Sequence, residues 1–250
     1  MKRTLIGALA IALALVGAGC NSSQNNNIEV TKPFVTAHAT NAGGTLHLTW
    51  NEETGAKFEI KAGSAVDTTD TGVTSYDVTT PVETVAVVAF SSANRSDAAI
   101  VICSKLVSSS VTFYNDLDTT HENGFGFDTT GAATAYKYAV ENFPMLDFIA
   151  TTSGGQTMLQ KAGGTATRAG DKLKAATGTY DAITIADSMG TYLNTVALYA
   201  DSAYYLRMSA NDTMWTAADN YAKMHVDSIS GTKVSVTVTY QTVNGIRWLK

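Results

Sequence analysis

The sequence is poor in the residue types that support catalysis and metal binding. It has 2 cysteines and 4 histidines among 250 residues. The histidines are not closely paired and do not fit the HExxH spacing, and there is no CxxC, so the common zinc signatures are missing. A G-x-S-x-G nucleophile elbow and a Walker loop are missing as well. We therefore predict no catalytic residues, no cofactor and no enzymatic activity.

Positive charge is also scarce. The formal net charge is −5, and removal of an N-terminal segment containing Lys2 and Arg3 would make it −7. There is no run of basic residues that could neutralise a phosphate backbone, so we expect no nucleic-acid partner. Charged residues are only 16% of the chain and there are 3 prolines. The dominance of Thr, Ala, Ser, Val and Gly favours strands and turns over helix bundles.

The N-terminus has the order of an export signal. Lys2 and Arg3 precede an apolar run, Leu5–Val16, and the small residues Gly17–Gly19 precede Cys20. A transmembrane helix needs about 20 apolar residues, and this run is nearer to the apolar region of a signal peptide. We predict a signal peptide over residues 1–19, with cleavage before Cys20.

The motif Ala18-Gly19-Cys20 resembles the bacterial lipobox. The resemblance implies diacylglycerol on Cys20, which would anchor the protein to a membrane of the cell envelope, facing the periplasm or the cell exterior. An ordinary secreted protein cut at another position is the alternative. The polar residues after Cys20 are low in complexity, so we predict that residues 20–33 form a disordered tether.

Two β-rich domains are expected after the tether, and the first covers residues 34–104. Alternation over Thr45–Trp50 and over Lys57–Lys61 predicts two antiparallel strands, with His47 facing solvent. A Pro81-containing turn and a long apolar strand follow. This order resembles the fibronectin type III module, which implies a β-sandwich. Cys103 ends the last apolar strand and is expected to be a buried thiol.

The second domain is predicted to be antiparallel and β-rich over residues 108–250, with Ser108–Ser110 as the linker. Tyr221–Ile229 and Lys233–Tyr240 alternate on either side of a Ser-Gly turn and predict a hairpin. Val236 should lie on its buried face. Tyr221, Lys223, His225 and Asp227 should share the opposite, wetter face.

This hairpin is similar to the closing hairpin of β-rich envelope lipoproteins, among them haem-scavenging surface lipoproteins of anaerobic bacteria. In those proteins histidines bind the iron, so the resemblance implies a search for a ligand site. We take His121, His225 and Tyr221 as the candidate ligand-binding residues. Exposed aromatic side chains could also bind sugars by stacking on them. At their spacing in this sequence, however, we expect most of these aromatic residues to be core residues or cross-strand pairs.

One acidic loop has the oxygen-rich character of a calcium site. The candidate metal ligands are Asp116, Asp118 and Glu122, although the regular EF-hand positions are missing. The competing interpretation is a solvated turn in which Asp and Asn accept hydrogen bonds from the backbone.

The sequence favours a non-enzymatic cell-envelope lipoprotein that acts in adhesion, ligand capture or assembly with surface proteins or glycans. The alternative is a haem- or carbohydrate-binding surface lipoprotein that serves uptake. A hydrolase would require two carboxylates, such as Asp116 and Asp227, to converge in a cleft, and chain position does not decide whether they do.

Overall fold

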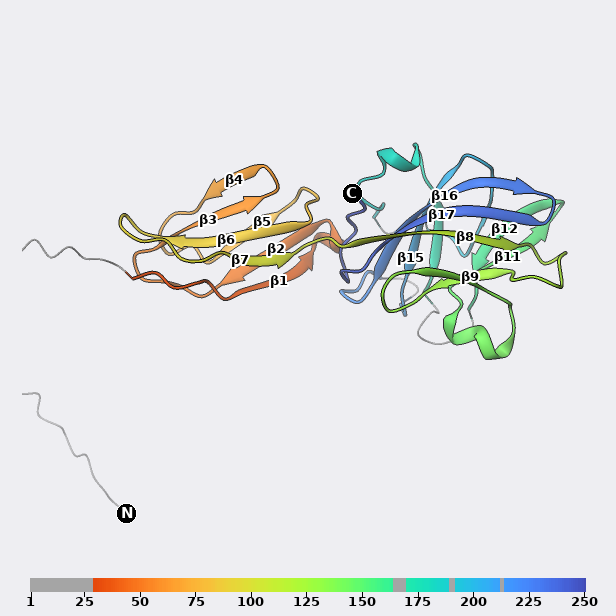
Figure 1. Cartoon of the computed structure of the whole chain (residues 1–250), viewed down its shortest axis with the longest axis horizontal. Helices are drawn as coiled ribbons and strands as arrows, with labels where there is room; N and C mark the ends of the chain where they lie inside the picture. Colours follow the sequence, from red (N-terminus) through yellow and green to blue (C-terminus); the bar gives the residue numbers. More distant parts are fainter. Residues whose placement is uncertain (1–28, 164–169, 189–191, 212–213) are drawn as a thin grey trace, which may run out of the picture.

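The protein is mainly β and consists of two units arranged end to end (Figure 1). The computed structural model describes residues 29–163, 170–188, 192–211 and 214–250. The strands form four sheets in which all pairings between strands are antiparallel. The prediction of a mainly β, antiparallel architecture is therefore confirmed.

The first unit is a sandwich of a three-stranded and a four-stranded sheet. The three-stranded sheet has the order β1-β2-β5 and the four-stranded sheet the order β4-β3-β6-β7. Their bounds are β1 Val35–Thr40, β2 Thr45–Trp50, β3 Lys57–Ala62, β4 Ala65–Thr68, β5 Ser75–Val78, β6 Thr84–Phe90 and β7 Ala99–Ile102, with a short 3-10 turn, η1, at Asn41–Gly43.

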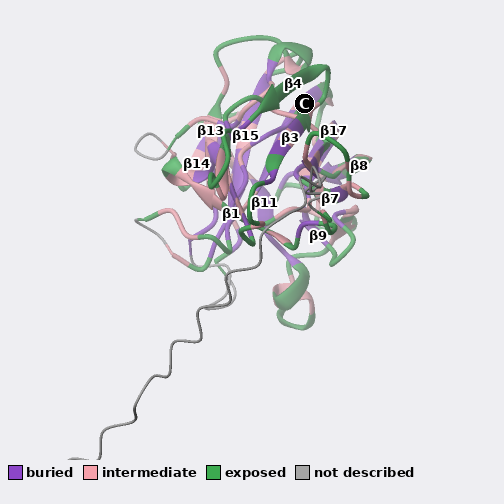
Figure 2. Ribbon diagram, turned by 90° about the vertical axis from the view of Figure 1, so that its left-hand side faces the viewer, coloured by how far each residue is buried: buried purple, intermediate pink, exposed green. Residues whose placement is uncertain are grey.

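Residue alternation positions the core of this sandwich as the sequence predicts. Leu48 and Trp50 point inward from β2 and meet Phe58 and Ile60 from β3. His47 lies on the outer face of β2, as expected. Cys103 is fully buried directly after β7, and this burial raises the pKa of its thiol to about 11. Figure 2 shows that buried residues follow the strands, whereas the edge strand β4 is exposed.

The second unit is built from two five-stranded sheets, with orders β10-β9-β11-β12-β14 and β13-β15-β16-β17-β8. The bounds of its elements are β8 Leu106–Tyr114, β9 Gly124–Phe127, β10 Ala133–Tyr136, η2 Val140–Met145, β11 Phe148–Ser153, β12 Gln156–Lys161, β13 Lys172–Ala175, η4 Tyr180–Ala182, β14 Thr195–Ala197, β15 Ala203–Met208, β16 Asn220–Ser230 and β17 Lys233–Gln241. A continuous apolar core lies between the sheets.

The predicted terminal hairpin is present as β16 and β17. Its strands pair from Tyr221↔Gln241 to Ser230↔Lys233, and the turn contains Gly231 at a φ of 61°, in the left-handed region that favours glycine. Val236 is fully buried on the core face. A bulge between Val226 and Ser228 interrupts the ladder near its far end.

Three expectations for the second unit are wrong. Ser108–Ser110 is not a linker, because it lies within β8 and pairs with β17. Asp181–Ile185, which the sequence also offers as a candidate strand of this sheet, is not a full strand: η4 occupies its start, and Ile185 makes an isolated bridge to Trp248. The outer face of β16 is not open to water at Tyr221 and Lys223, which are both buried. The alternation within β16 could not reveal that its outer face is covered as well, because the covering residues come from the 180–186 segment and from the C-terminal residues.

The C-terminal segment joins the two units. We call this joint, formed by residues 245–248 and η1, the neck. Ile246 and Trp248 are fully buried in the core of the first unit, although they follow the last strand of the second. The Arg247 backbone N–H donates to the Gly43 carbonyl at 3.0 Å, and its guanidinium Nε donates to the Ala42 carbonyl at 2.7 Å. The turn that carries η1 is therefore clamped by residues some 200 positions later in the chain.

A single glutamine links the strands on both sides of the neck. Gln241, at the end of β17, is fully buried. Its side-chain amide donates to Ser104 Oγ at 2.7 Å and to the Trp248 carbonyl at 2.8 Å, and its oxygen accepts from the Lys105 N–H at 3.0 Å. These contacts tie the outgoing chain at 104–105 to the returning C-terminal segment.

Candidate functional site

The candidate site is a cavity of about 310 Å³ in the second unit, between the ends of its two sheets and beside the neck. This volume lies at the lower end of the range for small-molecule sites. Polar and apolar side chains both line it. They are Phe127, Asp147, Asp171, Met208, Ser209, Ala210, Ala218, Asn220 and Tyr240.

Two buried aspartates lie in the cavity wall. Asp147 precedes β11, and its Oδ2 accepts a hydrogen bond from the Phe127 N–H at 2.8 Å. Asp171 precedes β13, and its Oδ1 accepts from the Ser209 N–H at 2.8 Å. Both aspartates take part in further interactions as well. Burial of a carboxylate is costly unless it is hydrogen-bonded, and the backbone N–H groups offset that cost here.

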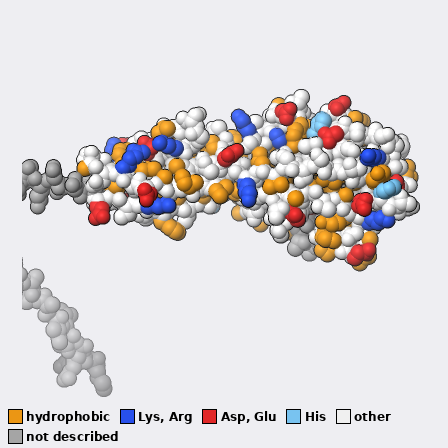
Figure 3. All heavy atoms as spheres, in the orientation of Figure 1, with side chains coloured by type: hydrophobic (Ala, Val, Ile, Leu, Met, Phe, Trp, Pro, Cys, Tyr) orange, Lys and Arg blue, Asp and Glu red, His pale blue; other side chains and the backbone are white. Residues whose placement is uncertain are grey.

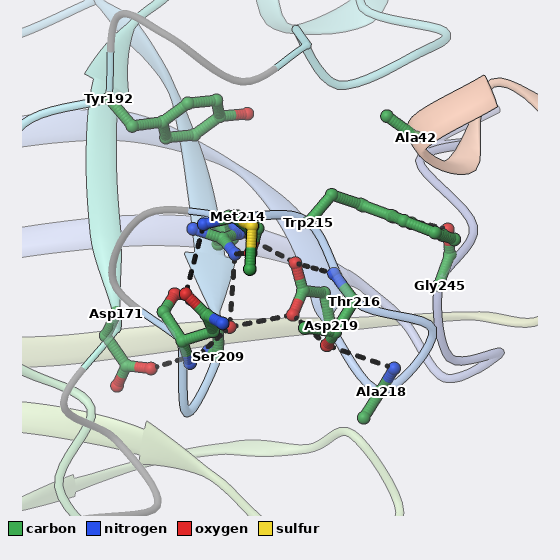
Figure 4. Close-up of polar contacts among 12 residues, drawn as sticks. Ala42, Asp171, Tyr192, Ser209, Met214, Trp215, Thr216, Ala218, Asp219 and Gly245 are labelled. Atoms are coloured by element: carbon green, nitrogen blue, oxygen red, sulfur yellow. Dashed lines mark hydrogen bonds and ion pairs between the residues drawn. The ribbon is translucent and has the colours of Figure 1, made fainter.

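One wall of the cavity is the connection between β15 and β16, which a buried ion pair supports (Figure 4). Arg207 Nε lies 2.8 Å from Asp219 Oδ2, and the two side chains are 1% and 0% exposed. Ser209 Oγ donates to Asp219 Oδ1 at 2.7 Å, and Thr216 Oγ1 donates to the same oxygen at 2.7 Å. The ion pair therefore fixes both ends of the connection.

The same connection is attached to the neck. Trp215 Nε1 donates to the Gly245 carbonyl at 3.2 Å, and the Gly245 N–H donates to the Asp219 carbonyl at 2.6 Å. A Cβ on Gly43 would lie 2.2 Å from the Gly245 oxygen, so only glycine permits this approach. The wall of the cavity and the joint between the units are thus one connected structure.

Aromatic rings and an amide complete the cavity. The rings of Phe127 and Tyr240 lie 4.6 Å apart between centroids, tilted by 31°. Asn220 Nδ2 donates to Asn244 Oδ1 at 2.8 Å, which orients its amide group. The arrangement offers carboxylate and amide oxygens that accept hydrogen bonds beside an aromatic surface.

In the predicted calcium loop, the Asp118 carboxylate is hydrogen-bonded to other residues of the same loop. The Asp118 carboxylate accepts hydrogen bonds from the Thr120 N–H and hydroxyl, at 2.9 and 2.7 Å, and also contacts the His121 ring. Bonds from Thr120, above all, hold the pKa of Asp118 well below its usual range. Asp116 and Glu122 are exposed. No group of three or more side chains suited to metal binding occurs within the described residues.

The candidate ligand residues are spread over the second unit rather than gathered at the cavity. His121 stacks on Tyr114 at 4.3 Å. His225 is partly exposed on the outer face of β16, where its Nδ1 lies 2.8 Å from Asp227 Oδ1. Tyr221, on the same face, is buried opposite Arg207, its cross-strand neighbour.

Lys223, between Tyr221 and His225 on the same face, contributes to the cover over β16. Its ammonium donates to the Ile183 carbonyl at 3.0 Å and lies 4.6 Å from the centre of the Tyr180 ring. Desolvation lowers the pKa of this lysine.

Cys20 and the predicted signal peptide lie outside the described residues. Within the described ranges, the structure has no helix that is long and apolar enough to cross a membrane.

Comparisons with known proteins give a structural neighbour and no family. No family model and no curated protein matches the chain. A solved structure of a DUF4466 family protein from Parabacteroides merdae ATCC 43184 aligns with 85% of this chain and 99% of its own, at 10% identity and a TM-score of 0.39. At that level of similarity the neighbour carries no functional inference for this chain.

Sequence reasoning missed the residues that form the cavity. Asp147 stands between Leu146 and Phe148 in an apolar run, and Arg207 stands between Leu206 and Met208. A charged residue within a buried strand is uncommon unless it is paired, so these positions were a usable signal. Their partners, which come from distant parts of the chain, had no comparable signal.

Proposed function

We propose that the protein is a non-enzymatic cell-envelope lipoprotein that captures a small polar ligand of the carbohydrate class in the cavity of its second unit. The observation that carries the proposal is the convergence of Asp147, Asp171 and Asn220 beside the Tyr240 ring. Carboxylate and amide oxygens accept hydrogen bonds from ligand hydroxyl groups, and an aromatic ring packs against the apolar face of a sugar. The cavity volume of about 310 Å³ suits one ring-sized group.

Contacts within the protein hold the two ends of the β15–β16 connection, which favours capture. The Arg207–Asp219 ion pair and the Trp215–Gly245 contact hold the β15–β16 connection before any ligand arrives. A preorganised site spends less free energy on ordering its side chains when it binds.

The first unit acts as a spacer of fibronectin type III type in this proposal. Thr31, near the start of the described chain, hydrogen-bonds to Glu53 in the β2–β3 loop, whereas the neck contacts η1 at the other end of β2. A lipid on Cys20 would therefore attach at the end of the spacer that lies away from the cavity (Figure 1).

Carbohydrate capture ranks ahead of haem capture because of the cavity lining. The described lining residues include Met208 but no histidine, and His225 and His121 lie on other surfaces. Haem iron in proteins is held by axial side chains, most often histidine. Titration of the same protein preparation with haem tests this ranking directly.

The test is a glycan array followed by calorimetry with the sugars that bind. We expect Tyr240→Leu and Asn220→Ala to weaken binding at least about tenfold, the size of one lost hydrogen bond or aromatic contact. Ser235→Ala, on the outer face of β17, is the matched control and should bind normally. An array without hits, combined with a haem Soret band that is lost in His225→Ala, would favour the haem alternative.

The anchor is tested separately from the ligand. Wild-type protein should partition into detergent, and Cys20→Ser should give a soluble or unprocessed form, because the thiol that carries the lipid is missing. Equal partitioning of the two forms would refute the lipoprotein assignment and leave the capture proposal standing.

A further inference from the structure

Three side chains form a row across the outer face of the three-stranded sheet in the first unit. His38 on β1 is directly opposite His47 on β2, and His47 is directly opposite Asp77 on β5. Leu46 and Leu48, the neighbours of His47, point into the core, so the row faces solvent. The two imidazoles therefore stand side by side on a surface that is open to ions.

The spacing of the rings matches shared coordination of one ion. The ring centroids of His38 and His47 lie 5.0 Å apart, and their planes meet at 60°. Two imidazoles bound to one tetrahedral zinc ion, at Zn–N distances near 2.0 Å, have ring centres about 5 Å apart. The antiparallel register thus sets a ring separation that is compatible with shared coordination of one metal ion.

Asp77 prepares His47 for this role. His47 Nδ1 lies 2.5 Å from Asp77 Oδ1. A neutral imidazole that donates its Nδ1 proton to a carboxylate has the lone pair on Nε2, which is the usual arrangement of a metal-binding histidine and its supporting carboxylate. The His47 side chain is 30% exposed and the Asp77 side chain is 58% exposed, so the pair lies on a surface that water reaches.

We propose that His38 and His47 bind one divalent transition-metal ion of the zinc or copper class, with Asp77 as the positioning residue of His47. The remaining coordination positions are taken by water or by a ligand from outside the chain. Two protein ligands bind more weakly than the three or four of catalytic and structural zinc sites. The site is independent of the proposed carbohydrate cavity, which lies in the other unit.

The chain supplies its own matched controls. His225 and His121 also lie beside aspartates, at 2.8 Å from Asp227 and 3.0 Å from Asp118. Directly opposite His225 on the neighbouring strands are Ala203 and Thr237 rather than a second histidine. If a histidine beside an aspartate were sufficient for metal binding, binding would therefore not depend on His38.

The test is titration of the untagged full chain with Zn²⁺ by calorimetry and with Cu²⁺ by electron paramagnetic resonance. Wild type should show one saturable ion with two nitrogen ligands. His38→Ala and His47→Ala should each lose one nitrogen and at least about tenfold in affinity. Asp77→Asn should weaken binding by about 10–100-fold but keep two nitrogens at saturation, which separates positioning from ligation. His225→Ala and His121→Ala should match wild type.

Two results would overturn the proposal. One is equal binding by wild type and the His38→Ala/His47→Ala double variant. The other is a wild-type copper spectrum with fewer than two nitrogen ligands at one equivalent. Because His38, His47 and Asp77 lie on an outer face, thermal unfolding should be unchanged in the variants of these three residues, and this measurement excludes misfolding as the cause of any loss.

Discussion

Tyr221 illustrates how one buried side chain couples stability to pH. Its hydroxyl is buried and makes no hydrogen bond of normal geometry, although it lies opposite the Arg207 side chain. Burial, and to a lesser extent the negative charge of Asp219, raises the pKa of Tyr221 above its usual value. In the folded protein this tyrosine therefore keeps its proton at pH values at which the unfolded chain has lost it.

We expect Tyr221→Phe to be nearly neutral at pH 7 and protective at high pH. A folded pKa above the unfolded value of about 10 makes stability fall as pH rises beyond about 10. Phe cannot ionise, so the variant should lose less stability between pH 7 and about pH 10.5. Urea unfolding at both pH values measures this.

The exposed Tyr199 provides the control for this measurement. Tyr199→Phe should lose as much stability as wild type between the two pH values. An equal loss in Tyr221→Phe and wild type would show that the burial of Tyr221 does not contribute to alkaline unfolding.

At the scale of elements, the β15–β16 connection depends on its buried ion pair. Removal of one partner leaves the other charge buried without compensation, which typically costs about 3–5 kcal/mol. We expect Asp219→Ala to lower the free energy of unfolding by about this amount, as measured by urea denaturation.

A double variant tests whether the cost comes from the unpaired charge. Arg207→Met/Asp219→Leu removes both charges and keeps apolar bulk, so it should recover a large part of the loss. If the double variant proves less stable than Asp219→Ala, the hydrogen bonds that Arg207 donates to Ser209 Oγ and to the Met214 carbonyl matter more than the unpaired charge.

Strands with clear alternation could be predicted from the sequence, and their outer cover could not. The β16–β17 hairpin follows from two alternating runs around a Ser-Gly turn, and its inward valines are buried as predicted. Burial of Tyr221 and Lys223 depends on a segment some 40 residues away, at Tyr180 and Ile183. Periodicity describes one strand and its two faces, and it contains no information on which distant segment covers a face.

The candidate cavity could not be predicted from the sequence for the same reason. It is formed where Asp147, Asp171, Ser209 and Tyr240 meet, and each comes from a different element end. The local signal was a charge inside an apolar run, as at Asp147, and it indicates a buried partner without naming it.

At the scale of the whole molecule, the neck determines how a destabilising substitution in one unit affects the other. The face of the molecule in Figure 3 shows acidic and basic side chains interspersed along both units. On this face, charge therefore does not separate one unit from the other. The apolar core of the first unit, in contrast, includes Ile246 and Trp248 from beyond the last strand of the second.

We expect Trp248→Ala to destabilise the first unit, which lies far from this residue in sequence. Loss of a buried tryptophan costs about 3–5 kcal/mol, because it leaves a cavity in the shared core, which also contains Leu48, Phe58 and Val85. Hydrogen exchange of the β2 and β6 amides should accelerate. Lys250→Ala, at an exposed position, is the control and should leave exchange unchanged. Unaltered exchange in Trp248→Ala would mean that the first unit is stable without the C-terminal segment.

The neck also sets an order of events during synthesis. Strands β1 to β7 emerge from the ribosome well before Trp248, which packs among them. Contacts between residues so far apart in sequence form slowly and late in folding. The first unit therefore has an incomplete core while the rest of the chain is being made. A chain in that condition resists premature folding, and this would suit the export through a membrane that we propose for this protein.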